Sequence, residues 1–175
     1  MDVSAVRDGW SLADDPDEVH ALLLASDRHW AAGSGLPPPR RDRQATEVAV
    51  REGRVHVVRE ATETVAMFTL AWQPPYPLTP TGFPDRRRPA YLRRLAVRPD
   101  RLAAGSLVGV QCVKRAIEVA TAAGGDALRS EANPDLVAVL RLLLALGFVR
   151  YGEPPADGPL RRIYLQRELG GAGRS

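Results

Sequence analysis

The sequence predicts an α/β fold: a mixed, mostly antiparallel central sheet of about seven strands with helices on both faces. Its 175 residues are 45% hydrophobic and 26% charged, which suffices for one sizeable core. Strand-like stretches alternate with stretches of helical periodicity. A strand–helix–strand stretch at 91–130 predicts parallel strands joined by a right-handed crossover, whereas the strand pairs on either side read as antiparallel hairpins. We expect a single domain at 1–169 and a loose tail at 170–175.

The N-terminal part is predicted to hold two helices followed by a hairpin. Residues 14–30 have an acidic start with Pro16 and then apolar residues at helical spacing. A Gly/Pro-rich break at 33–40 separates them from a weaker helical stretch that stops at Gly53. The expected elements are a strand at 3–6, helices at 14–30 and 41–53, and strands at 55–60 and 64–73.

The middle of the chain is predicted to hold a long loop, a strand and a helix. Residues 74–89 contain five prolines before Pro89 and show no periodicity, so we expect an irregular loop. The strand at 90–99 ends at Pro99, and the next helix follows Gly105 and closes at Gly124. Its expected apolar stripe consists of Leu107, Val110, Val113, Ala116, Ile117 and Ala120.

The C-terminal part is predicted to be a strand, a helix and two strands. The strand lies at 126–131, and a strongly apolar helix follows at 134–147, with Pro134 in its first turn and Gly147 at its end. The last strands are expected at 148–153 and 161–169.

Composition excludes several classes of function. Cys112 is the only cysteine and lies in a helical run, which predicts a buried structural thiol and excludes an internal disulfide or a Cys-rich metal site. The three histidines, His20, His29 and His56, lack metal-ligand spacing, so we expect no metal. No apolar run approaches the ~18 residues of a membrane span, and the first residues lack an apolar signal core, so we expect a cytoplasmic protein.

A loop of small residues joins the strand at 90–99 to the following helix, in the stretch "LAVRPDRLAAGSLVG" at 95–109. The first amides of a helix have no partner within it and favour phosphate. Small residues from Ala103 to Ser106 let a ligand approach the backbone, and Arg101 can add a charge-assisted contact. The loop alone fits either a phosphate cradle or a close-packed turn.

Two motifs carry a resemblance to a known family. In "VRPDRLAAGSL", Val97, Pro99 and Gly105 stand where a Val-x-Pro strand end and a central glycine are expected. In "EANPDLVAVLRLLLALGFVRYGE", Asn133 and the Gly-Phe pair at 147–148 match a second pattern. With these motifs the chain resembles the GNAT superfamily of acyl-CoA-dependent N-acetyltransferases, over 14–169 by element order and over 91–153 residue by residue. Three loop residues depart from the family pattern, namely Leu102, Ala103 and Leu107.

The resemblance implies acetyl-CoA as cosubstrate, bound where the fourth and fifth strands of the family diverge. It implies that main-chain groups of the fourth strand pair with the pantetheine arm and that amides of the loop hold the pyrophosphate. The implied cosubstrate-binding residues are Leu95, Ala96, Val97, Arg101, Leu102, Ala103, Ala104, Gly105, Ser106, Leu107 and Asn133.

The residues at the family's usual catalytic positions differ in this chain. Many family members carry a Glu base on the fourth strand and a Tyr acid in the last helix, and this chain has Arg93 and Leu143 near those positions. Glu131, at the end of the fifth strand, is the candidate base, and its alternative is a solvent-exposed strand end. Tyr151 and Tyr164 are either proton donors or sheet residues with solvated hydroxyls.

Three functions follow from these observations. The leading hypothesis is transfer of an acetyl (acyl) group from acetyl-CoA to a primary amine of a small molecule or peptide. The second is a module that binds acyl-CoA without turnover, motivated by Arg93 and Leu143. The third is a basic nucleic-acid-binding protein, which rests only on the basic balance and the arginine clusters at 37–43 and 86–88. No membrane partner is expected, and a two-fold homodimer is compatible with the resemblance.

The acceptor is left open, because specificity in the family lies in loops such as 33–40 and 74–89. Three aromatic residues near the second loop are candidates for an acceptor wall or for anchoring the core and loop, namely Trp72, Tyr76 and Phe83.

Overall fold

A computed structural model of the chain describes residues 9–75, 83–152 and 161–170. The chain forms two compact units. The first unit comprises Met1–Thr69 and Arg94–Cys112, and the second comprises Leu70–Arg93 and Val113–Ser175. Strands β3 and β4 and helix α4 contribute residues to both units.

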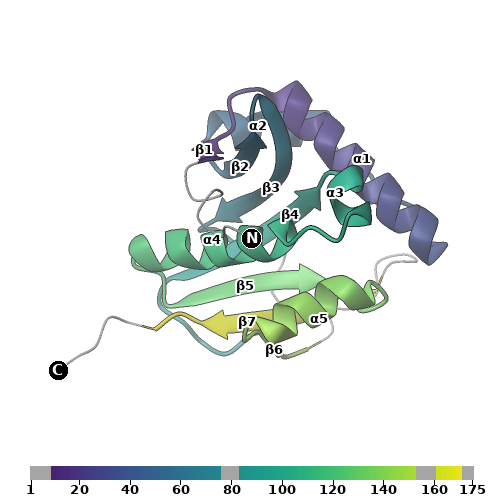
Figure 1. Cartoon of the computed structure of the whole chain (residues 1–175). Helices are drawn as coiled ribbons and strands as arrows, with labels where there is room; N and C mark the ends of the chain where they lie inside the picture. The colour runs from purple at the N-terminus through teal and green to yellow at the C-terminus, as the bar shows by residue number, and fades with distance from the viewer. Residues whose placement is uncertain (1–8, 76–82, 153–160, 171–175) are drawn as a thin grey trace. The chain divides into compact units, whose positions relative to one another are not determined.

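The described strands are hydrogen-bonded in the order β1-β2-β3-β4-β5-β7-β6 (Figure 1). β4 and β5 are parallel, and the other pairs with a described register are antiparallel. This mixed, mostly antiparallel sheet of seven strands confirms the predicted fold class. The strands are β1 (Trp10–Leu12), β2 (Val55–Glu60), β3 (Glu63–Ala71), β4 (Pro89–Val97), β5 (Ala127–Ala132), β6 (Val149–Arg150) and β7 (Ile163–Glu168). The helices are α1 (Pro16–Ser34), α2 (Arg43–Arg51), α3 (Pro99–Ala103), α4 (Val108–Ala122) and α5 (Val137–Ala145).

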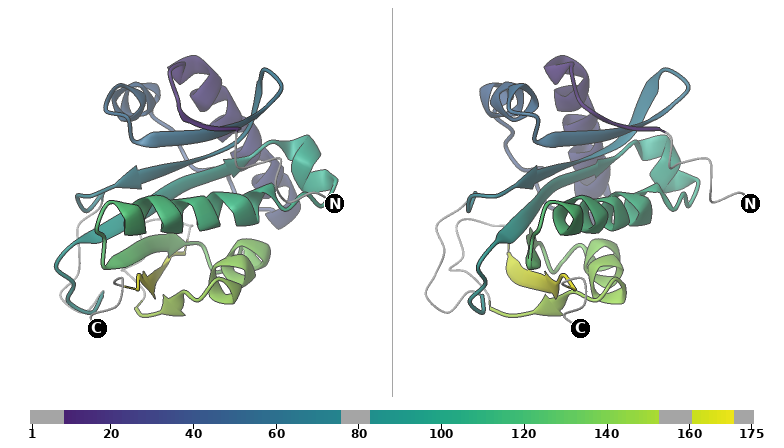
Figure 2. Two further views of the ribbon diagram at one scale, coloured as in Figure 1. Left: turned by 60° about the vertical axis from the view of Figure 1, so that its left-hand side comes forward. Right: turned by 90° about the vertical axis from the view of Figure 1, so that its left-hand side faces the viewer.

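An apolar core fills the first unit. Helices α1 and α2 lie on the same side of β2 and β3 (Figure 2), and α1 buries Val19, Leu22 and Leu23 in that core. The remaining buried residues of this core come from the strands, from α2 and from Ala13, which follows β1; those of the strands and α2 are Ala49, Val55, Val57, Met67 and Ala96. The helical spacing of apolar residues in 14–30 therefore reflects one buried face, since residues three and four apart lie on the same side of a helix.

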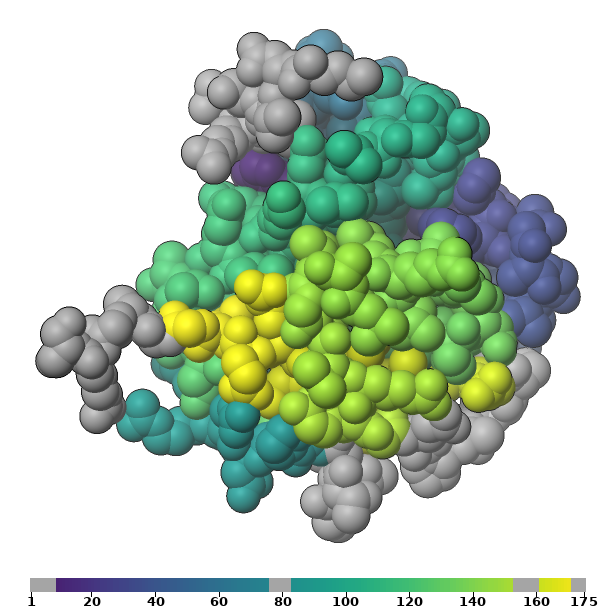
Figure 3. All heavy atoms as spheres, turned by 60° about the horizontal axis from the view of Figure 1, so that its bottom comes forward, coloured from purple at the N-terminus to yellow at the C-terminus, as the bar shows by residue number. Residues whose placement is uncertain are grey.

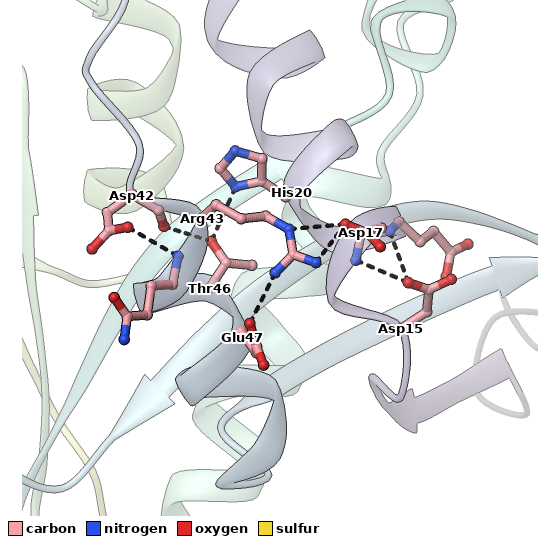
Figure 4. A network of polar contacts seen from close by, with 9 residues as sticks. Asp15, Asp17, His20, Asp42, Arg43, Thr46 and Glu47 are labelled. Atoms are coloured by element: carbon pink, nitrogen blue, oxygen red, sulfur yellow. Dashed lines mark hydrogen bonds and ion pairs between the residues drawn. The ribbon is translucent and has the colours of Figure 1, made fainter.

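Side-chain caps fix where α1 and α2 begin (Figure 4). The carboxylate of Asp15 accepts from the amides of Asp17 and Glu18, at 2.9 and 3.2 Å. The carboxylate of Asp42 accepts from the amide of Gln44 at 2.9 Å. Each cap satisfies amides that the first helical turn leaves without a carbonyl partner, which stabilises a helix by roughly 1 kcal/mol.

Two arginines of the 37–43 cluster join α2 and the preceding loop to α1. A nitrogen of Arg43 lies 2.6 Å from Asp17 of α1 and another lies 3.2 Å from Glu47 of α2, as part of the network in Figure 4. Arg41 makes a two-point contact with Asp27, at 2.6 and 2.9 Å. Ion pairs of Arg41 and Arg43 therefore hold α2 and the loop before it against α1.

In the second unit, β5 has two neighbours of unequal extent. Its pairing with β7 covers its whole length, from Ala127 to Ala132. Its pairing with β4 begins at Pro89–Ala127 and ends at Leu92–Ser130. β5 therefore continues for two residues, Glu131 and Ala132, beyond its ladder with β4.

Helix α4 confirms part of its predicted stripe. The stripe residues that are fully buried are Val113, Ala116 and Ala120. The prediction was wrong for Leu107, whose residue surface is 69% exposed, because the helix begins one residue later. Val108 and Cys112 are the buried residues at that end of the helix instead.

Two expected boundaries were also wrong. The strand expected at 90–99 ends at Val97, and Pro99 starts the short helix α3 within the expected small-residue loop, a position that suits its fixed φ. Pro134 lies before α5 rather than in its first turn: the side chain of Asn133 accepts from the amide of Asp135 at 2.9 Å and holds a turn there. The strand expected at 3–6 lies outside the described residues.

Helix α5 is apolar on more than its buried side. Leu143 is buried, whereas Val137 and Leu144 are exposed, as is Val149 of β6. Figure 3 shows the surface of the second unit to which α5 contributes.

Within the three described stretches, no helix has both the length and the apolar character needed to cross a membrane.

The turn between β2 and β3 gives a stability prediction. Glu60 pairs with Glu63, so Ala61 and Thr62 form the whole turn, and Ala61 has a φ of 53°. Glycine adopts this conformation without the steric cost that alanine bears. We expect Ala61→Gly to raise the free energy of unfolding by about 0.5–1 kcal/mol, measured by denaturant titration.

Thr62→Gly is the matched control, because its φ is not positive and glycine there only adds freedom to the unfolded chain. It should lower the free energy of unfolding. If both variants lower it alike, the backbone of Ala61 is not the source of the strain.

Candidate functional site

The loop between α3 and α4 is closed by its own backbone. The amides of Ala104, Gly105 and Ser106 each donate to a carbonyl oxygen of α3, at 3.0 to 3.1 Å. Gly105 has a φ of 69°, the left-handed conformation in which helices commonly end. Gly105 is therefore required by the turn itself, and these three amides are already used.

The first turn of α4 supplies amides that the helix cannot satisfy. The first helical hydrogen bond runs from the amide of Gln111 to the carbonyl of Leu107, at 3.1 Å. The amides of Leu107, Gly109 and Val110 come before it and have no acceptor within the helix. Together with the positive end of the helix dipole, such amides attract an anion. The best-placed donors thus lie slightly later in the chain than the small residues of the loop.

The arginines beside this loop are engaged with carboxylates of the first unit. Arg101, a predicted ligand of the pyrophosphate, pairs with Glu60, and Arg98 pairs with both Glu63 and Asp100. The hydrogen bonds from Arg98 lower the pKa of Asp100 to about 2, so Asp100 stays ionised at neutral pH. An anion at this loop would meet backbone amides directly and Arg101 only in competition with Glu60.

The end of β4 in the first unit has a partner that the sequence did not suggest. The amide of Arg98 donates to the carbonyl of Val65 in β3, at 2.9 Å. Because successive amides of a strand point to opposite edges, that of Val97 points away from β3. It donates at 3.4 Å to the hydroxyl of Ser26, a buried residue of α1. The available signal was a serine on the otherwise apolar stripe of that helix.

Arg94 interrupts the extended backbone of β4. Its φ is 52°, a conformation that costs a residue with a side chain roughly 1–2 kcal/mol. The ladder with β5 has ended two residues earlier, at Leu92. Non-glycine residues in this conformation concentrate at functional sites, where the surrounding structure holds them.

Glu131, the predicted base, lies on β5 just past the end of that ladder, in the second unit. Its side chain is 12% exposed, and its carboxylate lies 3.7 Å from the guanidinium of Arg162. Burial raises the pKa of Glu131 above its usual value of 4.5, and the nearby charges of Arg162 and Arg93 offset part of this rise. A carboxylate whose pKa is raised towards neutrality is a better proton acceptor than an exposed one.

A buried arginine lies on the same face of the sheet as Glu131, two residues earlier on β5. Arg129 donates to the side chains of Gln166 and Tyr91, at 2.8 and 2.9 Å, and to the carbonyl of Pro84 at 2.8 Å. Gln166 and Tyr91 are its paired residues on β7 and β4, so the three side chains form a row across the strands. The sequence alone does not reveal this cluster, since only the strand register brings its residues together.

Phe83 covers this row. Its ring centre lies 4.6 Å from the guanidinium carbon of Arg129 and 4.7 Å from the ring centre of Tyr164. Tyr164 is the residue of β7 that pairs with Glu131. The segment that begins at Phe83 is anchored again where Arg86 makes a two-point contact with Glu168.

Trp72, another candidate for an acceptor wall, contacts a different arginine from Phe83. Trp72 lies under the guanidinium of Arg88, 4.6 Å from it, which fits an anchoring role. Tyr76 lies outside the described residues. Tyr151 is 41% exposed, and Tyr164 is buried.

Three further predicted residues have clear structural roles. Asn133 holds the turn after β5 through its side-chain oxygen. Leu143, at the position where the family carries a Tyr, is only 3% exposed and has no proton to donate. Cys112 is fully buried, which confirms the expected structural thiol, and burial raises its pKa. Across the residues with described positions, no group of three His, Cys, Asp or Glu side chains could hold a metal ion.

The predicted residues divide between the two units. Those from Leu95 to Leu107 lie together in the first unit, at the end of β4 and the start of α4, whereas Glu131 and Asn133 lie in the second.

Comparison with known proteins finds matches among solved structures. No protein-family model and no curated protein matches the sequence. The structure of the NatC complex bound to Gag peptide and CoA contains a chain that matches 92% of this protein over 98% of its own length, with 14% identity and a TM-score of 0.68. The ribosomal-protein-S18-alanine N-acetyltransferase of Escherichia coli matches 94% over 95%, with 16% identity and a TM-score of 0.68. A GNAT-family acetyltransferase of Streptococcus agalactiae matches 91% over 94%, with 18% identity and a TM-score of 0.62.

These similarities extend over nearly the whole of each chain. The protein therefore has the fold of the GNAT acetyltransferases.

Proposed function

We propose that the protein is an acyl-CoA-dependent N-acyltransferase that transfers an acetyl group from acetyl-CoA to a primary amine. The observation that carries this proposal is the match of almost the whole chain to the fold of acetyltransferases, one of them in a complex with CoA. A fold alone does not determine chemistry, so the proposal also needs groups that fit the cosubstrate and the reaction.

The first unit offers groups that fit acetyl-CoA. The amides of Leu107, Gly109 and Val110, which have no acceptor within α4, are proposed to bind the pyrophosphate. The main chain of Leu95, Ala96 and Val97 is proposed to pair with the pantetheine arm, and the residues from Arg101 to Ser106 to surround the phosphates. Pairing of Val97 with the arm requires its amide to leave the long hydrogen bond to Ser26.

Glu131 is the proposed catalytic base. An amine attacks the thioester carbonyl only after losing its extra proton, and the C–S bond then breaks as the new C–N bond forms. Glu131 would accept the proton of the acceptor ammonium, which its raised pKa favours. The leaving thiolate would take its proton from water, because Leu143 cannot donate one.

The buried Leu143 also favours a second candidate, a protein that binds acyl-CoA without turning it over. The two candidates differ in thiol release. A panel of primary amines at saturating acetyl-CoA should give amine-dependent release for the enzyme, whereas tight binding with only background hydrolysis would favour the silent module. The acceptor class, a cytoplasmic location, a homodimer and the single-domain organisation remain predictions.

Leu107 allows a direct test of cosubstrate binding by backbone amides. Leu107→Ala keeps the amide and shortens an exposed side chain, whereas Leu107→Pro removes the amide but no intrahelical hydrogen bond. We expect Leu107→Pro to bind CoA at least about tenfold more weakly than Leu107→Ala, since a hydrogen bond to a charged group is worth roughly 1.5–3 kcal/mol. Titration calorimetry measures the difference, and unfolding of both variants without ligand checks that the fold is kept.

Equal CoA affinity of the two variants would contradict the role of this amide. Absence of any CoA binding to the wild-type protein at millimolar concentration would remove the proposed function altogether.

Glu131→Gln tests the base. In the wild type, kcat should rise with pH through the pKa of Glu131, because only the ionised carboxylate accepts a proton, and this midpoint should lie above the usual 4.5. Glu131→Gln should lose this rise and have a kcat about 100-fold lower at neutral pH. Glu118→Gln is the control: Glu118 lies on the surface of α4, pairs with Arg115, and its loss should leave the profile unchanged. A wild-type profile retained in Glu131→Gln would show that another group is the base.

A further inference from the structure

One carboxylate in the second unit has two arginines beside it. Glu131 lies 3.7 Å from Arg162, which is longer than the roughly 2.7–3.2 Å of an N–H···O hydrogen bond. The charge of Arg93, on β4, also acts on Glu131. Side-chain exposure is 38% for Arg162 and 12% for Glu131, so both side chains retain contact with solvent.

This arrangement joins a proton acceptor to an anion receptor. A carboxylate binds an ammonium group, and a guanidinium binds a carboxylate through two parallel N–H donors. In an α-amino acid the ammonium and carboxylate groups are attached to the same carbon atom. Such a zwitterion would contact Glu131 with its amine and Arg162 with its acid, and so replace a long ion pair by two short ones.

We propose that the acceptor is an amine with a carboxylate beside it, of the class of free α-amino acids, and that Arg162 selects it. This inference rests on the proposed acetyl transfer, with Glu131 as the base. The transfer then converts the zwitterion into an N-acyl amino acid anion: the amine proton goes to Glu131, the C–N bond forms, and the C–S bond of the thioester breaks. Arg162 keeps its anionic partner throughout, so it fixes the amine beside Glu131 during the reaction.

The neighbouring charges separate this proposal from transfer to a peptide. A peptide N-terminus has the same amine, but a neutral carbonyl replaces the carboxylate, and it would leave the guanidinium of Arg162 with no anion from the acceptor. The loss of a charged partner at a site built for one typically costs more selectivity than the loss of an apolar contact. An amino acid should therefore be preferred to its own carboxamide.

Arg161 provides a matched control variant. It is adjacent in sequence, carries the same side chain and pairs with another carboxylate, Asp135, at 3.3 Å. Its side chain is 55% exposed. Arg161→Gln therefore removes an equal charge from the same segment without removing the group next to Glu131.

The kinetic test compares the twenty L-amino acids with their carboxamides as acceptors, by thiol release at saturating acetyl-CoA. For the best acceptor, kcat/KM should be at least about tenfold higher for the acid than for the amide. Arg162→Gln should bring this ratio close to one, Arg162→Lys should restore part of it, and Arg161→Gln should keep it. A ratio near one in the wild type, or a ratio that survives in Arg162→Gln, overturns the inference while amine acetylation itself still holds.

A binding test does not depend on turnover. Saturation-transfer NMR without acetyl-CoA measures the same amino acids and carboxamides against the wild type, Arg162→Gln and Arg161→Gln. We expect binding of an acid that its amide lacks and that only Arg162→Gln abolishes. If no amine is acetylated, the proposed function fails, and this test still decides whether Arg162 recognises a carboxylate: equal binding of acid and amide, or no binding of either, overturns it.

Discussion

Much of the candidate site depends on the early end of one ladder of hydrogen bonds. The pairing of β4 with β5 stops at Leu92 and Ser130, although both strands continue. Backbone polar groups beyond that point need other partners, because an unpaired buried group is costly. In the first unit, the amide of Val97 donates to the hydroxyl of Ser26. In the second, β5 carries Glu131 past the ladder, where its side chain keeps an exposure of 12%.

Burial of the charged side chain of Arg129 lowers the stability of the second unit. Arg129 is 5% exposed, and among the described residues its side-chain hydrogen bonds go to neutral oxygens of Gln166, Tyr91 and Pro84. Desolvating a guanidinium costs several kcal/mol, which hydrogen bonds and the stacked ring of Phe83 offset. The contacts of this one side chain hold β4, β5 and β7 in place against the segment that begins at Phe83. Phe83, which also packs against Tyr164, is therefore held by electrostatics as well as by apolar packing.

The sequence predicts the fold well because periodicity reports burial directly. Helix α1, the hairpin of β2 and β3, and the parallel pair around α4 all follow from apolar spacing and from Gly and Pro positions. Boundaries failed where a local hydrogen bond decides them, as with the turn that Asn133 holds before α5. The candidate site was predicted only in part. Glu131 could be chosen as a candidate from its place at a strand end. Ser26, Arg129 and Arg162 could not, because strand register and contacts between residues far apart in sequence bring them to their partners.

The burial of Cys112 has a practical chemical consequence. The chain has no other cysteine, and this thiol is fully buried in α4 with a pKa raised by burial, so little of the reactive thiolate forms at neutral pH. The folded protein is thus almost silent towards disulfide-exchange and maleimide reagents. A thiol that such reagents detect in a mixture with the folded protein comes from a small molecule, and a cysteine introduced on the surface would be the single site of attachment for a spectroscopic label.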